Sequence, residues 1–179
     1  MTVYLMGLRG VGKSTLGAAL APRLGGSFID LDDITPAILG KSSPAACLTE
    51  LGEPAFREAE RRALDDPRVL SASVVSLGGG TPTAPGAAEL LLRRARAGAH
   101  VIYLAASPAT LRARLRRDDP SARPGLLGGT ALDEVERLFT ARDPIYRSIA
   151  TSVVEANGDT ALVLERVSWL VGASPNRPA

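Results

Sequence analysis

A chain of 179 residues is long enough to bury about 70% of its unfolded surface around a single core, so no second domain is needed. Its 21 basic and 19 acidic residues leave a formal net charge of +2, which is too small to favour a nucleic-acid partner. The single cysteine, Cys47, excludes an internal disulfide, and the presence of one histidine, His100, and no other cysteine argues against a zinc site of the His/Cys type.

Short runs rich in β-branched residues alternate along the chain with longer helical patterns. Strands are predicted at Val3–Met6, Ser27–Leu31, Ser73–Leu77, His100–Leu104 and Ser152–Glu155. Helices are predicted at Lys13–Leu24, Ile34–Leu39, Pro54–Leu64, Ala87–Ala97, Pro108–Arg117, Leu132–Ser148 and Thr160–Val171. This alternation predicts an α/β protein with three α/β/α layers and a five-stranded, mainly parallel sheet. We expect one domain over residues 1–172 and a disordered tail over residues 173–179.

The first predicted strand runs into a phosphate-binding pattern. Residues 7–15 read G-L-R-G-V-G-K-S-T, which fits G-x-x-x-x-G-K-[ST] between an apolar strand and a helix. Glycines let the backbone bring its N–H groups close to phosphate oxygens. The lysine ammonium then bridges the β- and γ-phosphates, and the serine hydroxyl ligates Mg²⁺. We therefore expect a nucleotide at this loop, bound by Gly10, Val11, Gly12, Lys13, Ser14 and Thr15.

Two aspartates follow at the end of the second predicted strand, where residues 28–33 read F-I-D-L-D-D. Alternation along a strand puts Asp30 and Asp32 on one side, at the end nearest the phosphate loop. One carboxylate could hold the waters of a bound metal, and the other could accept the proton of an attacking hydroxyl. The alternative is that these acids only cap the next helix, a role that we expect for Asp33.

Three later segments carry glycines and arginines that complete the candidate site. The third predicted strand ends in Gly78–Gly80, which exposes backbone N–H groups; a flexible turn is the alternative. Arg57 and Arg142 lie in the segments G-E-P-A-F-R-E-A-E and R-D-P-I-Y. Guanidinium groups bind carboxylates bidentately. For each arginine the alternative is a solvated helix face, and Arg57 could instead pair with Glu60, one turn further on.

The segment between residues 118 and 130 is rich in glycine and proline and contains Arg123. A surface segment of this length beside a nucleotide site is typical of a lid that closes over the bound nucleotide. A plain surface loop is the alternative interpretation.

The sequence lacks the features of a targeted or membrane protein. It enters an apolar run at once, with no basic leader or cleavage site. No stretch approaches about 18 unbroken apolar residues. We therefore expect a cytoplasmic protein with no membrane partner, and we expect it to act as a monomer.

Taken together, these segments resemble the shikimate kinase family of P-loop enzymes, which use ATP to phosphorylate the 3-hydroxyl of shikimate. The resemblance spans about residues 3–155 and implies a P-loop kinase with a short mobile lid, ATP and Mg²⁺ as cofactors, and shikimate as the small-molecule substrate. It is carried by the phosphate loop at Gly7–Ser14, F-x-D-x-D at Phe28–Asp32, G-E-x-x-F-R-x-x-E at Gly52–Glu60, G-G-G at Gly78–Gly80 and R-x-P-x-Y at Arg142–Tyr146.

The resemblance implies a division of roles at the reacting centre. Asp32 contacts the reacting diol and is the candidate base. Lys13 and the lid residue Arg123 neutralise charge on the transferring phosphoryl group. Asp30 supports Mg²⁺ through water, beside the direct ligand Ser14.

The resemblance also implies the contacts around that centre. Arg57 and Arg142 hold the carboxylate of shikimate, and the glycine tripeptide, Gly78–Gly80, binds the substrate through its backbone. The implied substrate contacts are Asp32, Arg57, Gly78, Gly79, Gly80 and Arg142. Arg116 lies against the nucleotide, and Asn157 belongs to the adenine loop formed by residues 156–158.

The chain departs from the family pattern in two places. Gly125 interrupts the R-P-L-L run that normally follows the lid arginine. The segment 40–48 contains Pro44 and one extra residue, and it has Leu48 near a position where the family usually has an aromatic ring. The glycine affects the register and reach of Arg123, and the change around Pro44 would reshape the pocket wall that packs on the ring, so weaker shikimate binding or a different substrate is an open alternative. The alternatives are a related kinase of the gluconate type and a P-loop domain that binds ATP without catalysis.

Overall fold

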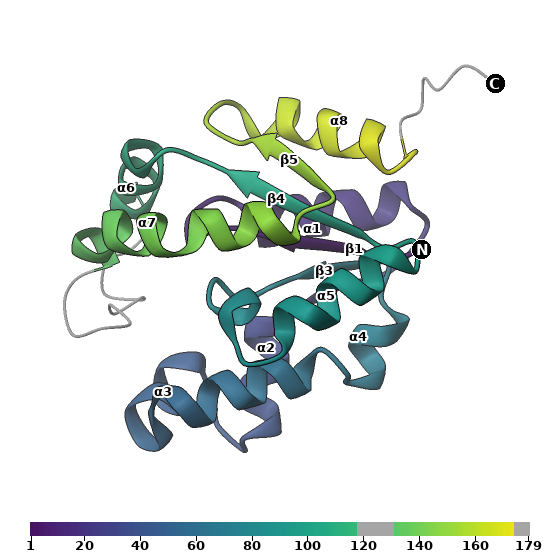
Figure 1. Cartoon of the computed structure of the whole chain (residues 1–179). Helices are drawn as coiled ribbons and strands as arrows, with labels where there is room; N and C mark the ends of the chain where they lie inside the picture. Colours follow the sequence, from purple (N-terminus) through teal and green to yellow (C-terminus); the bar gives the residue numbers. More distant parts are fainter. Residues whose placement is uncertain (118–130, 174–179) are drawn as a thin grey trace.

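The computed structural model describes residues 1–117 and 131–173 (Figure 1). Five strands form one sheet in the order β2-β3-β1-β4-β5, and every neighbouring pair is parallel, which confirms the predicted sheet. The strands are β1 (Val3–Met6), β2 (Phe28–Asp30), β3 (Val74–Ser76), β4 (His100–Ala105) and β5 (Ser152–Glu155). The expected lid over residues 118–130, with Arg123, and the tail beyond Ala173 lie outside the described residues.

The strand register brings the candidate residues to one edge of the sheet. Asp30, the last residue of β2, pairs with Ser76 of β3, which in turn pairs with Leu5 of β1. Because the three strands are parallel, the segments that follow them leave the sheet side by side. The phosphate loop, the aspartates and the glycine tripeptide therefore emerge at neighbouring points.

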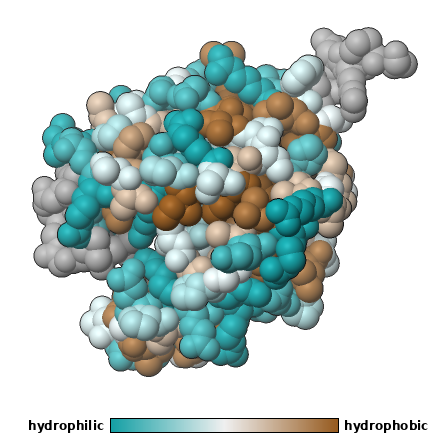
Figure 2. All heavy atoms as spheres, viewed as in Figure 1, coloured by the Kyte–Doolittle hydropathy of each residue, from teal (hydrophilic) through white to brown (hydrophobic). Residues whose placement is uncertain are grey.

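Helices cover both faces of the sheet. On one face α1 (Lys13–Arg23) packs against α8 (Thr160–Leu170), and on the other α5 (Ala87–Arg96) packs against α7 (Ala131–Ile149). The central strands β1, β3 and β4 are buried except for His100 at the start of β4, whereas β2 and β5 are partly exposed. Burial on both sides explains why β1, and β4 after His100, read as apolar runs. Figure 2 shows hydrophobic residues gathered between α7 and α5, with hydrophilic residues over the outer surface of α5.

The structure corrects the prediction for the end of the second strand. β2 stops at Asp30, and α2 (Leu31–Ile38) begins at the next residue. Asp30 is the N-cap of this helix, because its Oδ1 accepts from the N–H of Asp32 at 3.0 Å. Asp30 and Asp32 therefore do not alternate along one strand, and the capping role expected for Asp33 belongs to Asp30.

The next helix is longer than predicted. α3 runs over Pro44–Ala63 rather than starting at Pro54, and it bends at Gly52, whose φ of 81° and ψ of 165° are not helical. Ser43 caps its first turn by accepting from the N–H of Ala46 at 3.1 Å. Pro44 fits here because the first turn of a helix needs no N–H donor from that residue.

The remaining predicted elements end within one or two residues of the observed ones. α6 (Pro108–Arg117) matches its prediction, while α4 (Pro67–Ser71) and the short 3-10 helix η1 (Thr81–Thr83) were not predicted. Ala173, placed in the disordered tail by the sequence prediction, donates its N–H to Ser168 O at 2.8 Å. None of the helices in the described ranges is long and apolar enough to cross a membrane. The only tryptophan, Trp169, lies near the end of α8 with 71% of its surface exposed.

Candidate active site

A cleft of about 940 Å³ opens at the carboxyl ends of the strands, between the phosphate loop, α2, α3, α6 and α7. It brings together most of the residues that the sequence predicted for a nucleotide and acceptor site. These are Gly10, Gly12, Lys13, Ser14, Thr15, Asp30, Asp32, Arg57, Gly79, Gly80 and Arg142. The cleft is thus lined by a phosphate loop on one side and by paired acids and arginines on the other.

The phosphate loop has the backbone conformation that its glycines allow. Gly10 and Gly12 have φ values of 81° and 99°, in a region that other residues rarely enter. Gly12 is the N-cap of α1, so the helix begins at Lys13 and points its N-terminus into the cleft. Lys13 is largely buried, and its Nζ donates to the carbonyls of Gly7 and Leu8 at 3.0 and 3.3 Å. These contacts hold the ammonium group against the loop.

Ser14 and Asp30 form the oxygen pair best suited to a metal. The Ser14 hydroxyl donates to the carboxylate of Asp30, whose other oxygen caps α2. Mg²⁺ prefers oxygen ligands and is usually held by one or two protein groups together with water and phosphate oxygens. Among the residues that the structure describes, no group of three or more His, Cys, Asp or Glu side chains could hold a metal ion. This donor set fits a metal that arrives with a nucleotide.

Asp32 lies in the first turn of α2, with its side chain open to the cleft. The protein walls around it reduce its hydration and raise its pKa, and the nearby charges of Asp30 and Asp33 raise it further. The cations Lys13 and Arg9 oppose this shift. Asp32 is therefore a carboxylate at the centre of the cleft with more affinity for a proton than a free aspartate.

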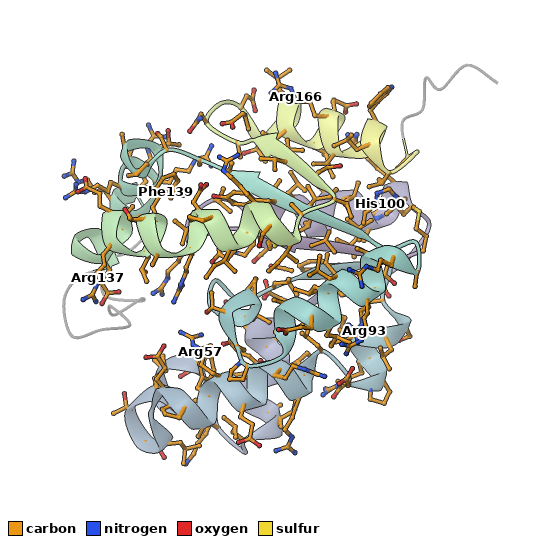
Figure 3. All side chains as sticks on the ribbon, in the orientation of Figure 1. Arg57, Arg93, His100, Arg137, Phe139 and Arg166 are labelled. Carbon is orange, nitrogen blue, oxygen red and sulfur yellow. The ribbon has the colours of Figure 1, made fainter. Side chains whose placement is uncertain are left out.

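Arg57 points from α3 toward α7 (Figure 3) and lines the cleft while paired within its own helix. It donates to Glu60 at 2.5 Å and to Glu53 at 2.9 Å, so the pairing with Glu60 that the sequence left open is present. Glu60 is only 2% exposed and also accepts from the Thr81 hydroxyl at 2.8 Å. Burial raises the pKa of Glu60, and Arg57 and Thr81 counteract that rise. These two ion pairs fix the guanidinium of Arg57 at the wall of the cleft.

The glycine tripeptide lies between Arg57 and Arg142. Arg142 is buried in α7 and donates to the carbonyl of Gly79 at 2.9 Å. A Cβ on Gly80 would overlap the guanidinium of Arg57. A Cβ on Gly78 would come within 2.6 Å of the carboxylate of Glu60, which is too close for any side chain. Close approach to charged side chains therefore favours glycine at Gly78 and Gly80, whereas a Cβ on Gly79 would meet no atom closer than 3.6 Å.

Arg114 is a cleft residue beside the phosphate loop that the sequence reasoning missed. It lines the cleft and donates to the carbonyl of Val11 at 3.1 Å and to those of Ala156 and Gly158 at 2.8 and 3.0 Å. It thereby joins the phosphate loop to the loop after β5. The buried residues Leu111 and Leu115 show which face of α6 packs inward, and Arg114 lies three residues after Leu111. This spacing from Leu111 could have identified Arg114 from the sequence.

The other two residues predicted on the nucleotide side lie away from the cleft wall. Arg116 is exposed on α6 and is absent from the lining. Asn157 connects two turns: its side-chain oxygen accepts from Ser107 N at 2.7 Å, and its nitrogen donates to Glu155 at 3.1 Å. It supports the loop after β5 from outside the cleft.

Comparison with known proteins gives one consistent result. The shikimate kinase family model matches residues 9–170. A shikimate kinase from Oleidesulfovibrio alaskensis is 36% identical over 173 residues, covering 96% of this chain and 98% of that protein.

Solved structures agree. A shikimate kinase from Bacteroides thetaiotaomicron has a TM-score of 0.81 at 30% identity and covers 96% of this chain and 98% of its own. A shikimate kinase from Acinetobacter baumannii in complex with shikimate has the same TM-score of 0.81 at 29% identity, with 98% and 95% covered. The similarity extends over nearly the whole length of each protein.

Proposed function

Because the chain belongs to the shikimate kinase family, we propose that its cleft transfers the γ-phosphoryl group of ATP to the 3-hydroxyl of shikimate. The products are shikimate 3-phosphate and ADP, and the enzyme is an ATP-dependent kinase that acts on an alcohol. The observation that carries this proposal is the meeting of Lys13, Asp32, Arg57 and Arg142 in one cleft.

The acceptor is held by its carboxylate. Arg57 and Arg142 lie on either side of the glycine tripeptide, and each presents a guanidinium group to the cleft. Guanidinium groups match a carboxylate in shape and charge, which fixes the orientation of a ring as well as its position. The backbone of the tripeptide supplies further contacts to the hydroxyls.

Asp32 is the candidate base. As the acceptor oxygen bonds to the γ-phosphorus, its proton passes to the carboxylate of Asp32, and the bond from the γ-phosphorus to the bridging oxygen breaks to leave ADP. The raised pKa of Asp32 suits a group that must take up a proton in this step. The rest of the catalysis is positioning and charge neutralisation.

The nucleotide is bound by the phosphate loop and by the N-terminus of α1, with Lys13 at its β- and γ-phosphates. Ser14 and Asp30 would hold Mg²⁺, the first directly and the second through water. When bound, this ion neutralises charge that develops on the phosphates. The backbone N–H groups of the loop keep the phosphate chain in line with the acceptor.

Arg114 is the arginine that we assign to the nucleotide side, since it lines the cleft and holds the loop that follows β5. The roles expected for Arg116, Asn157 and the lid residue Arg123 stay predictions. We also propose that the enzyme acts in the cytoplasm as a monomer.

Coupled release of ADP from MgATP tests the proposal. Wild-type protein is assayed with shikimate, with gluconate, with AMP and without an acceptor, and Lys13→Ala serves as the blank. We expect release that depends on shikimate and is reduced about 10²- to 10³-fold in the blank, because a cation on the transferring group is lost. Turnover with gluconate alone would instead show that the segment around Pro44 has redirected specificity. ATP binding without turnover of any acceptor would support a non-catalytic domain.

A further inference from the structure

The glycine tripeptide is the meeting point of the acceptor site. Gly80 lies against the guanidinium of Arg57, and Gly79 lies against Arg142. A Cβ on Gly78 would be 2.8 Å from the carboxylate of Asp32, so this residue touches the candidate base. Any rotation of the tripeptide would therefore disturb all three charged groups at once.

Each carbonyl of the tripeptide accepts from a protein donor. The Gly78 oxygen accepts from Thr81 N at 3.0 Å, and the Gly80 oxygen accepts from Thr83 N at 2.9 Å. The Gly79 oxygen accepts from two side chains of α7, Arg142 at 2.9 Å and the hydroxyl of Tyr146. The tripeptide thus turns its oxygens toward the protein, and no described residue accepts from its N–H groups, which leaves them for a ligand as far as residues 1–117 and 131–173 are concerned.

Arg142 and Tyr146 of α7 fix the orientation of the peptide group between Gly79 and Gly80. A trans peptide is planar, so its C=O and N–H point in opposite directions. Fixing the Gly79 oxygen therefore fixes the direction of the Gly80 N–H at the cleft. Arg142 must share its guanidinium with the acceptor carboxylate, whereas the Tyr146 hydroxyl donates to the Gly79 oxygen and also has a hydrogen bond with Arg142.

Tyr146 is built to keep this contact. Its side chain is fully buried, and burial raises its pKa to about 12, so the hydroxyl remains a donor at working pH. Its ring packs edge-to-face on Tyr103 of β4, with 5.2 Å between the ring centres. The Tyr103 hydroxyl donates to Asp143 at 2.8 Å, so the two tyrosines share a ring contact but hold different partners.

We propose that Tyr146 is a positioning residue for the acceptor: its hydroxyl orients the peptide between Gly79 and Gly80, and through it the contacts that bind shikimate. This inference rests on the proposed function and deepens it. Tyr146 does not touch the reacting atoms. It acts from the protein side of the tripeptide, and we expect the binding of ATP to change little when its hydroxyl is removed.

The test compares Tyr146→Phe with the matched control Tyr103→Phe. Each variant loses one buried hydroxyl and keeps the aromatic pair. We expect Tyr146→Phe to raise both the KM and the Kd for shikimate about 5- to 10-fold, the effect of one hydrogen bond. The kcat and the KM for ATP stay within about twofold. Tyr103→Phe leaves all four constants near the wild-type values.

Steady-state assays and titration calorimetry with shikimate supply the constants, and amide exchange at Gly80 reports the loosened peptide directly. Exchange should quicken in Tyr146→Phe and stay unchanged in Tyr103→Phe. If the two variants behave alike, or if Tyr146→Phe binds shikimate as the wild type does, Tyr146 has only a packing role. Failure of the proposed function is a separate result, because the wild type itself would then show no turnover with shikimate.

Discussion

The nucleotide half and the acceptor half of the cleft are built in different ways. The phosphate loop is one continuous segment, Gly7–Thr15, and its binding groups are backbone N–H groups at the start of α1. The acceptor half joins side chains from α2, α3 and α7 around the glycine tripeptide; Arg142 and Gly79, which are hydrogen-bonded, lie 63 residues apart in the chain. Under the proposed function, a local motif binds the nucleotide, which is common to many kinases, and long-range packing forms the acceptor site.

Of the substitutions that test the separation of the two halves, we expect the largest change in KM at Arg142. Arg142→Ala removes a guanidinium from the acceptor carboxylate, and we expect the KM for shikimate to rise about 10- to 100-fold, with the KM for ATP unchanged. Arg147→Ala is the control, because Arg147 lies on the same helix but is exposed and pairs with Asp143. Equal losses for both substrates in steady-state assays would show that the two halves are not separate.

A smaller effect is expected at Arg114, on the nucleotide side. Arg114→Ala should raise the KM for ATP about tenfold, as for one charge-assisted hydrogen bond, and leave the KM for shikimate within about twofold. Arg116→Ala is the matched control on the exposed face of the same helix. If Arg116→Ala had the larger effect on ATP, the placement implied by the family resemblance would be right and our assignment wrong.

The smallest effect is expected in the pH dependence of stability. The folded protein raises the pKa of Asp32 above its unfolded value, so ionised Asp32 disfavours folding at pH values above both. Below both values Asp32 is protonated in either state and has no effect. Asp32→Asn should therefore raise the Tm at pH 8 by no more than about 2 °C, since the side chain faces water, and this gain should shrink toward pH 4. A gain that grows on acidification would contradict the sign of the shift.

The two halves also differed in how far sequence could predict them. The phosphate loop was predictable because its function requires consecutive residue types, and the five parallel strands were predictable from their apolar runs. Asp30 and Asp32 were placed correctly at the cleft for a wrong reason: a strand and a capped helix both bring residues after β2 to this edge. The helix forms here instead of a longer strand because the carboxylate of Asp30 caps α2.

The contacts that sequence did not predict depend on packing between distant segments. Nothing near Tyr146 in the chain indicates that its hydroxyl meets Gly79, because the pairing depends on how α7 lies over the sheet. Arg114 and Arg116 lie on different faces of α6, and the family resemblance pointed to Arg116, which is the exposed one. The ion pair between Arg57 and Glu60 could be predicted from the sequence because the two residues lie three positions apart on one helix.

The exposed position of the only tryptophan determines what the native protein can report by fluorescence. Trp169 lies near the far end of α8 from Thr160, which borders the cleft, and the two are separated by about 14 Å of helix. Its indole is already in water, so neither ATP nor the acceptor should change its emission. A tryptophan introduced at Leu48, on the cleft wall, would supply an optical signal against this constant background.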